Sequence, residues 1–210
     1  ILRLLPETAT LSGAVMVGPE NVVTLDQRRL RQLRGTAAAM IFQEPSTALN
    51  PVYTVGWQLA EGLRAHGKYT KKQARAHAIE MLRRVGIPEP DRRVDDYPHQ
   101  FSGGQKQRIV IAMALALDAS VLIADEPTTA LDVTVQAEIL DLLRRCRDEF
   151  GTAIVLITHN MGVVADLADR VAVMYHGEIV ETAPVRELFA APKHPYTRKL
   201  LAAVPRVELV

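Results

Sequence analysis

Two adjacent carboxylates follow a short apolar segment near the middle of the chain. Residues 121–124 are all apolar, and Asp125 and Glu126 come directly after them. Short apolar runs are typical of strands in a parallel sheet, which places ligands at the carboxyl edge of its strands. Since successive side chains of a strand point in different directions, one carboxylate can hold Mg²⁺ while the other faces an attacking water. The alternative interpretation is a strand that ends in a solvated acidic turn.

A serine and two glycines precede an apolar-rich stretch upstream of these carboxylates. Ser102 is a favourable N-cap residue, and the glycines of Gly103-Gly104-Gln105 let backbone N–H groups approach a ligand closely. A helix N-terminus with free N–H groups favours an anion, phosphate above all. The alternative is a glycine turn that only begins a core helix.

A histidine and a glutamine follow two further apolar segments. His159 comes after residues 154–157, and it would lie on the same sheet edge as the two carboxylates if the two strands are neighbours. Gln43 comes after residues 40–42, and its neutral amide can coordinate Mg²⁺ and orient water. The alternative for a lone histidine is a structural role and not a catalytic one. The alternative for the glutamine is a hinge between the strand-rich and the helical part of the chain.

The first part of the chain has the pattern of short strands. We expect strands around 14–17 and 38–42, separated by turn residues and a basic stretch at 28–34. Residues 1–6 have the pattern of the end of a helix, and we interpret the sequence as a fragment that is cut or disordered at both ends.

Helical spacing begins after this part and later alternates with strands. Thr70 is the expected N-cap of a helix that Gly86 and Pro88 end. Residues 121–124 and 154–157 are both expected to form strands buried on both faces of a parallel sheet. A helix is expected between them, which makes a strand–helix–strand unit. One face of that helix carries Ile139, Leu140, Leu143 and Cys146.

Composition limits the function classes. The 210 residues are 48% hydrophobic and can bury one sizeable core. Because 25 basic residues nearly balance 24 acidic ones, the chain lacks the basic excess typical of nucleic-acid binding. A single cysteine rules out an internal disulfide and favours a reducing compartment. No apolar run approaches the roughly 18 residues of a membrane span, so we expect any membrane role to be peripheral.

The order of these motifs resembles the ABC ATPase family. In that family Gln43 would be the Q-loop residue, Ser102 to Gln105 the signature, Asp125-Glu126 the end of Walker B, and His159 the switch histidine. The D-loop would be Ala130-Leu131-Asp132. Two positions depart mildly from the family pattern, because Phe101 replaces the usual leucine and Asn160 stands where aspartate is common.

The resemblance implies an α/β P-loop NTPase core with an inserted helical subdomain. The core would comprise residues 1–43 and 119–180, the helical signature subdomain residues 44–118, and a C-terminal tail residues 181–210. The family's Walker A loop, a Gly-rich turn ending in Gly-Lys-Ser/Thr, does not occur in the sequence. We therefore expect a core truncated at its N-terminus, and we expect the chain by itself not to hydrolyse ATP.

The resemblance also implies roles for the motifs, with ATP and Mg²⁺ as cofactors. Glu126 would polarise the attacking water, His159 would contact the γ-phosphate, and Asp125 and Gln43 would serve Mg²⁺. Two subunits would sandwich two ATP molecules, each gripped by the signature of the partner. The D-loop would lie at that dimer interface.

Further segments are similar to the oligopeptide and dipeptide importers of the family. They are residues 41–45 with 49–51, residues 97–100, residues 124–136, and His194-Pro195-Tyr196-Thr197. The implied partners are a second ATPase subunit, identical or different, integral-membrane permease subunits and, indirectly, an extracytoplasmic solute-binding protein, with no nucleic acid. The implied location is peripheral, on the cytoplasmic face of the membrane.

Other functions share much of this pattern. Nickel importers and a subunit of phosphonate breakdown are the nearest alternatives, and a soluble ABC ATPase acting on DNA is a third. DNA-repair relatives usually carry long insertions in the helical zone, and the sequence has none. A partner that cannot hydrolyse ATP is the remaining alternative, although Glu126 and His159 argue against it. The sequence assigns neither a cargo nor an iron–sulfur cluster after Val210.

Overall fold

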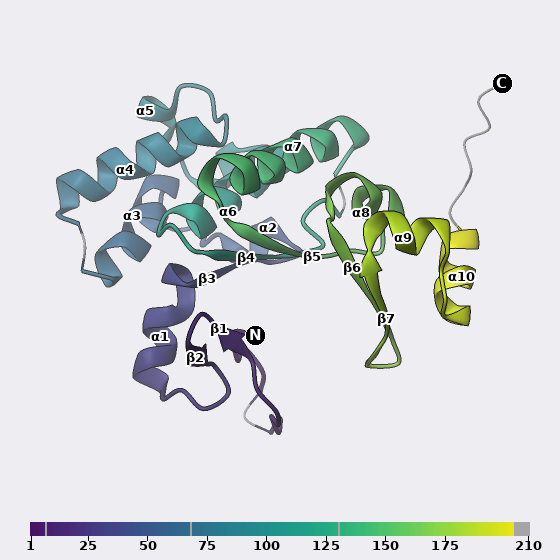
Figure 1. Ribbon diagram of the computed structural model, residues 1–210. Helices are drawn as coiled ribbons and strands as arrows, with labels where there is room; N and C mark the ends of the chain where they lie inside the picture. The colour runs from purple at the N-terminus through teal and green to yellow at the C-terminus, as the bar shows by residue number, and fades with distance from the viewer. Residues whose placement is uncertain (7, 68, 130, 204–210) are drawn as a thin grey trace. The chain divides into compact units, whose positions relative to one another are not determined.

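The computed structural model describes residues 1–6, 8–67, 69–129 and 131–203 (Figure 1). The chain forms two compact units, Ile1–Ile157 and Thr158–Val210. The predicted division into a core, a helical subdomain and a tail stays a prediction.

A three-stranded parallel sheet lies at the centre of the first unit. Its strands follow the order β3-β4-β5, with Ile41 of β3 opposite Ala124 of β4 and Asp125 of β4 opposite Ile157 of β5. The predicted strand–helix–strand unit is confirmed, since a long helix connects β4 to β5 and buries its predicted apolar face. The elements are β3 (Ala38–Ile41), β4 (Val121–Asp125), α7 (Val133–Phe150) and β5 (Ala153–Ile157).

Of the two strands predicted to be buried on both faces, one is buried and the other is not. Leu122, Ile123 and Ala124 of β4 are buried, as expected for a central strand. The expectation that β5 is also buried on both faces is wrong, because Val155 is 41% and Ile157 48% exposed. Val155 and Ile157 lie two residues apart and therefore point to the same face of the sheet, which the described residues of the first unit leave partly exposed at β5.

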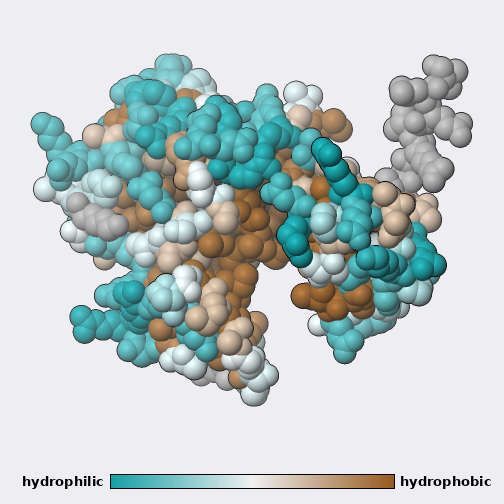
Figure 2. Space-filling model, in the orientation of Figure 1, coloured by the Kyte–Doolittle hydropathy of each residue, from teal (hydrophilic) through white to brown (hydrophobic). Residues whose placement is uncertain are grey.

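An apolar groove of about 460 Å³ runs along this part of the first unit. Figure 2 shows hydrophobic side chains at the surface near the middle of the view. Met40, Phe42, Ile123 and Ile157 contribute to its wall, and Asp125 also lines it. One of the two motif carboxylates therefore lies beside apolar surface.

Helices occupy the zone that the sequence predicts to be helical. The expected N-cap is confirmed, since Thr70 forms a capping box with Gln73 at the start of α4. The helix ends at Arg84, and Gly86 follows in a left-handed conformation with φ 75°, as the predicted stop requires. The elements here are α2 (Pro45–Ala48), α3 (Val55–Ala65), α4 (Lys71–Arg84), α5 (Pro90–Arg93), η1 (Pro98–Gln100) and α6 (Gly103–Leu115).

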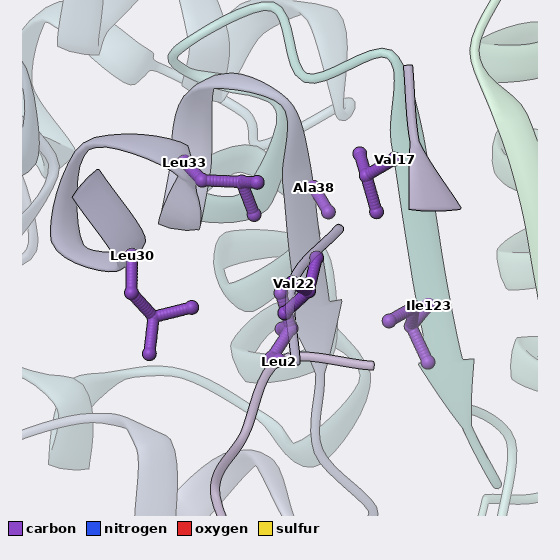
Figure 3. Packing of buried hydrophobic residues seen from close by; sticks show 7 residues of the cluster. All are labelled: Leu2, Val17, Val22, Leu30, Leu33, Ala38 and Ile123. Carbon is purple, nitrogen blue, oxygen red and sulfur yellow. The ribbon is translucent and has the colours of Figure 1, made fainter. Parts of the chain in front are cut away.

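The N-terminal segment does not form the helix end that its pattern predicts. The first five residues are not helical, and Arg3 has a left-handed φ of 52°. Five residues can close at most one helical hydrogen bond, whereas Leu2 gains burial in a cluster with Val22 and Ile123 (Figure 3). Tertiary packing therefore decides the conformation of this segment.

The basic stretch upstream of β3 forms a helix that the sequence analysis did not assign. This helix is α1 (Gln27–Thr36), and it buries Leu30 and Leu33 in the cluster of Figure 3. Its arginines are exposed except Arg34, which is half-buried and donates to the Leu2 carbonyl at 2.8 Å. The expected strand around residues 14–17 is present as β1 (Met16–Val17), paired with β2 (Glu20–Asn21) in a short antiparallel hairpin.

The second unit consists of an antiparallel hairpin with helices packed on it. Val173, Ala183 and Leu188 form its buried centre. Its elements are α8 (Met161–Leu167), β6 (Arg170–Tyr175), β7 (Glu178–Pro184), α9 (Val185–Ala190) and α10 (Pro195–Ala202). In the described part of the chain, no helix of either unit is both long and apolar enough to cross a membrane.

A carboxylate clamp fixes the start of α10. The side chain of Glu181 accepts hydrogen bonds from the backbone N–H groups of Lys193 and His194, at 2.8 and 2.9 Å. Tyr196 stacks on Tyr175 with ring centroids 4.0 Å apart. The pKa of Glu181 is lowered to about 2 by the Thr197 hydroxyl and by the two N–H groups. The hydroxyl acts without a well-aligned hydrogen bond to the carboxylate. The tail motif 194–197 therefore docks α10 on the hairpin.

We predict that Glu181→Gln loosens α10. An amide presents an NH₂ group to one of the two N–H donors, so one hydrogen bond is lost and α10 amides exchange faster in hydrogen-exchange mass spectrometry at pH 7. Because folding lowers the pKa of Glu181 from its ordinary value of 4.5, the clamp is intact above about pH 4.5 and is lost as the pH falls towards 2. Glu178→Gln, an exposed position on the same strand, is the control. Equal protection of α10 in both variants would contradict the clamp.

Candidate functional site

The two carboxylates lie at the carboxyl end of the central strand. Asp125 is the last residue of β4, and Glu126 follows it in a left-handed conformation with φ 49°. That conformation is uncommon for a residue other than glycine and costs on the order of 1 to 3 kcal/mol. The backbone N–H of Glu126 donates to the carbonyl of Ile157 at 2.9 Å, so β4 and β5 stay connected beyond the end of β4.

The chain turns sharply after Glu126. The backbone N–H of Thr129 donates to the carbonyl of Glu126 at 3.1 Å, and the Thr129 hydroxyl donates to Glu126 Oε2 at 2.8 Å. The Glu126 side chain is half-buried. The turn thus fixes both the backbone and the carboxylate of this residue.

Gln43 lies at the same edge of the sheet. Strands β3 and β4 are parallel with Ile41 opposite Ala124, so the chain leaves both strands at the same level. Gln43 comes two residues after the end of β3 and is exposed. The carboxyl edge therefore brings together the ends of the segments that carry Gln43 and the carboxylates.

The side chains at this edge are of types that can serve a magnesium ion. Mg²⁺ is usually bound through one or two carboxylates together with phosphates and water. Asp125 with the amide of Gln43 nearby in the topology fits that pattern, and their role as ligands stays a prediction.

The predicted N-cap of α6 is confirmed and forms a full capping box. Ser102 Oγ accepts from the N–H of Gln105 at 3.3 Å, and Gln105 Oε1 accepts from the N–H of Ser102 at 3.1 Å. Ser102 and Gly103 are exposed, so the first turn of the helix is open to a ligand. Whether it grips nucleotide stays a prediction.

The two glycines of this segment have different surroundings. A Cβ atom built on Gly103 would meet nothing within 4 Å, whereas one on Gly104 would lie 2.5 Å from Cγ1 of Val135 in α7. Real Cβ atoms do not approach other atoms so closely, so Gly104 allows α6 and α7 to pack together. The sequence pattern indicates close ligand approach for both glycines, and packing against Val135 gives Gly104 a structural reason to lack a side chain.

Arg93 is a residue that the sequence analysis missed. Its guanidinium lies over the ring of Phe101 at 4.1 Å, pairs with Asp96 at 3.0 Å, and donates to the carbonyl of Gln100 at 2.9 Å. Its side chain is only 12% exposed, so these contacts fix the chain segment that precedes Ser102. The signal in the sequence was Phe101 itself, since an aromatic ring in place of leucine offers a partner to a cation.

The segment after the turn leads into α7. Ala130 lies outside the described residues. Leu131 is half-buried, and Asp132 is the N-cap of α7, accepting from the N–H of Val135 at 2.9 Å. The proposed place of these residues in a dimer interface stays a prediction.

His159 belongs to the second unit. Its predicted place on the edge that carries the carboxylates requires the strands before them to be neighbours, and β4 and β5 are neighbouring parallel strands. His159 comes two residues after the end of β5 and is exposed. Its placement beside the carboxylates stays a prediction.

The chain matches two known protein families. The family described as ABC transporter matches residues 2–129, which is more than half of the chain. The chain belongs to the ABC transporter family. A second match, described as the C-terminal region of oligopeptide/dipeptide transporters, covers residues 180–209 and contains the tail motif that docks α10.

Several curated members of the ABC transporter family are similar over almost the whole chain. A probable peptide ABC transporter ATP-binding protein of Sinorhizobium fredii is 54% identical over 98% of this chain and 62% of the relative. The dipeptide transport ATP-binding protein of Bacillus subtilis is 50% identical over 100% of this chain and 63% of the relative. The chain thus spans less than two thirds of the length of these relatives.

Solved structures of ABC transporter proteins share the α/β fold. A dimeric ATP-binding cassette in a post-hydrolysis state, bound to ADP and Pi, has a TM-score of 0.72 with 30% identity over 83% of this chain and 74% of that one. CbiO1 of Clostridium perfringens, part of an ABC transporter complex, has a TM-score of 0.73 with 29% identity over 93% of this chain and 74% of that one. The expectation of an α/β ABC ATPase fold is therefore confirmed.

We predict that Gly104→Ala destabilises the chain. The new methyl group collides with Val135, and overpacking of this kind typically costs about 1 to 3 kcal/mol. A chain of this size loses roughly 2 to 4 °C of melting temperature per kcal/mol, which differential scanning fluorimetry resolves. Gly103→Ala is the matched control and should be neutral or slightly stabilising, since alanine favours a helix and nothing lies near its Cβ. Adding Val135→Ala should restore the stability of Gly104→Ala, and no rescue would contradict the packing argument.

Proposed function

We propose that the full-length protein is the ATP-hydrolysing subunit of an ABC importer for di- or oligopeptides. The observation that carries the proposal is the placement of Glu126 at the carboxyl end of the central strand of an ABC transporter fold, held in a left-handed turn. Strained backbone at a carboxylate is commonly kept for a functional reason.

Each of the predicted site residues has a different role in ATP hydrolysis. ATP supplies the γ-phosphoryl group when bound, and Mg²⁺ neutralises charge on its phosphates. Glu126 would accept a proton from the attacking water, and Asp125 and Gln43 would hold the metal. His159 would contact the γ-phosphate. Since phosphoryl transfer depends mainly on positioning and electrostatics, a fixed carboxylate is what this edge must provide.

The start of α6 acts on a different nucleotide. The exposed N-terminus of α6, with Ser102 and Gly103 at the surface, suits the phosphates of an ATP bound to a second subunit. Leu131 and Asp132 lie at that interface. The dimeric state of the solved ATP-binding cassette supports a sandwich of two subunits.

The phosphate-gripping loop of the family is not part of these 210 residues. No Gly-rich string ending in Gly-Lys-Ser/Thr occurs in the sequence. Hydrolysis is therefore proposed for the full-length protein, and the 210-residue chain by itself should not hydrolyse ATP.

The cargo and the partners rest on the tail and on the relatives. Residues 180–209 match the C-terminal region of oligopeptide/dipeptide transporters, and the relatives carry names of peptide and dipeptide transport proteins. These names favour peptides over nickel or a role in phosphonate breakdown. The protein would work on the cytoplasmic face of the membrane with permease subunits, and indirectly with a solute-binding protein.

We predict that Glu126→Gln and Asp125→Asn have different effects in the full-length protein. Glutamine keeps the size of the side chain but cannot accept a proton, so hydrolysis falls by about 10² to 10⁴ in rate, or roughly 3 to 5.5 kcal/mol. ATP binding survives, and the ATP-bound dimer accumulates in size-exclusion chromatography with Mg-ATP. Asp125→Asn weakens Mg²⁺-dependent binding and traps no dimer.

The same experiment tests the assignment of the two carboxylates. Near wild-type phosphate release by Glu126→Gln would show that Glu126 is not the general base. If Asp125→Asn traps the dimer and Glu126→Gln does not, the roles assigned to Asp125 and Glu126 must be exchanged.

We predict that Ser102→Arg abolishes transport and leaves ATP affinity of the isolated full-length subunit nearly unchanged. The arginine fills the open start of α6, which meets the nucleotide of the partner and not that of its own subunit. Peptide uptake by cells and ATP binding to the monomer, measured by calorimetry, separate the two effects. A large loss of ATP affinity in the monomer would contradict this geometry.

A further inference from the structure

The hydroxyl of Thr129 holds the carboxylate of Glu126. Thr129 Oγ1 donates to Glu126 Oε2 at 2.8 Å, and the Thr129 N–H donates to the Glu126 carbonyl at 3.1 Å. One residue thus bonds both the side chain and the backbone of the glutamate. Hydrogen bonds to a charged acceptor are stronger than those between neutral groups, so this contact can fix a flexible side chain.

The rest of Glu126 is already fixed. Its N–H donates to the Ile157 carbonyl at 2.9 Å, and its φ of 49° sets the direction in which the side chain leaves the backbone. The freedom that remains is rotation within the side chain, which costs up to about 2 kcal/mol to restrict in a glutamate. The Thr129 hydroxyl is placed to restrict that rotation before substrate binds.

The turn that carries Thr129 is anchored on both sides. Gln107 of α6, which is 1% exposed, donates through Nε2 to the Pro127 carbonyl at 2.8 Å. Gln136 of α7 donates to the hydroxyl of Thr128 at 3.1 Å, and Thr128 is 8% exposed. Since buried hydrogen bonds are costly to break, Thr129 is held on a rigid support.

We propose that Thr129 is a positioning residue, whose hydroxyl orients the Glu126 carboxylate for the general-base step. The proposal rests on the proposed function of Glu126. In that step the water oxygen bonds to the γ-phosphorus, the bond from phosphorus to the ADP oxygen breaks with its electron pair leaving on ADP, and the water proton moves to Glu126. A misdirected carboxylate receives that proton poorly although ATP is still bound.

The test uses the full-length protein with Thr129→Val, Thr129→Ser, Glu126→Gln and the double variant Glu126→Gln/Thr129→Val. Valine keeps the shape of threonine and removes the donor, so kcat should fall by about 10- to 100-fold, as misplacement of a catalytic group does, while KM for ATP changes little. Serine keeps the donor and should restore most of kcat. In the Glu126→Gln background Thr129→Val should cause no further loss, because Thr129 acts through that carboxylate.

Two further measurements separate positioning from damage to the fold. The double variant Glu126→Gln/Thr129→Val should still trap the Mg-ATP dimer in size-exclusion chromatography as Glu126→Gln does, which only a folded protein can do. Thr152→Val makes the same chemical change at a buried threonine before the amino end of β5, and its kcat should stay at the wild-type value.

The outcomes distinguish this proposal from the proposed function. If the wild type does not hydrolyse ATP, or if Glu126→Gln hydrolyses it normally, the proposed function fails and the role of Thr129 fails with it. If Glu126→Gln is inactive, three results overturn the role of Thr129 alone. They are wild-type kcat in Thr129→Val, no rescue by Thr129→Ser, and a further loss of rate in the double variant.

Discussion

The parallel register of β4 and β5 is the constraint on which the site depends. Asp125 lies opposite Ile157, and the pairing extends one residue further through the hydrogen bond from the Glu126 N–H to the Ile157 carbonyl. Because side chains alternate along a strand, a shift of one residue would turn Asp125 to the other face of the sheet and would move the turn at Glu126 away from Ile157. The same bond helps to hold Glu126 in its left-handed conformation, from which the chain can turn at once towards α7.

Signals that act over a few residues could be predicted from the sequence. The N-caps Ser102 and Thr70 depend on a side chain and an N–H group three residues apart, so their residue types suffice. The match of five motifs in order gave the family. The helical conformation of the N-terminal segment and the burial of β5 were predicted wrongly, because both depend on contacts distant in the sequence, whereas β5 itself was predicted correctly. Ile157 has the pattern of a core residue, and only the structure shows that it lies on a face of β5 that the first unit leaves 48% exposed.

The site shows the same division between local and distant effects. Gly104 reads as a ligand-binding glycine, but its reason for lacking a side chain includes Val135, which lies on another helix. Thr129 is close to Glu126 in sequence, yet its role depends on the left-handed conformation of Glu126. No residue type near Glu126 predicts that conformation. Gln107 reads only as part of a polar helix start, and the structure shows it buried against the Pro127 carbonyl.

The contacts that fix Glu126 and its turn include neutral partners from three different segments. Thr129, Gln107 and Gln136 hold the turn through a hydroxyl and two amides. A lysine or arginine could also fix the carboxylate, but its charge would weaken the glutamate as a proton acceptor. The Thr129 hydroxyl orients the carboxylate and leaves its charge in place, while the two glutamine amides hold the turn that carries Thr129. These neutral contacts are also less sensitive to salt than exposed ion pairs such as Arg75–Asp95, so the turn should keep its geometry as ionic strength and nucleotide charge change.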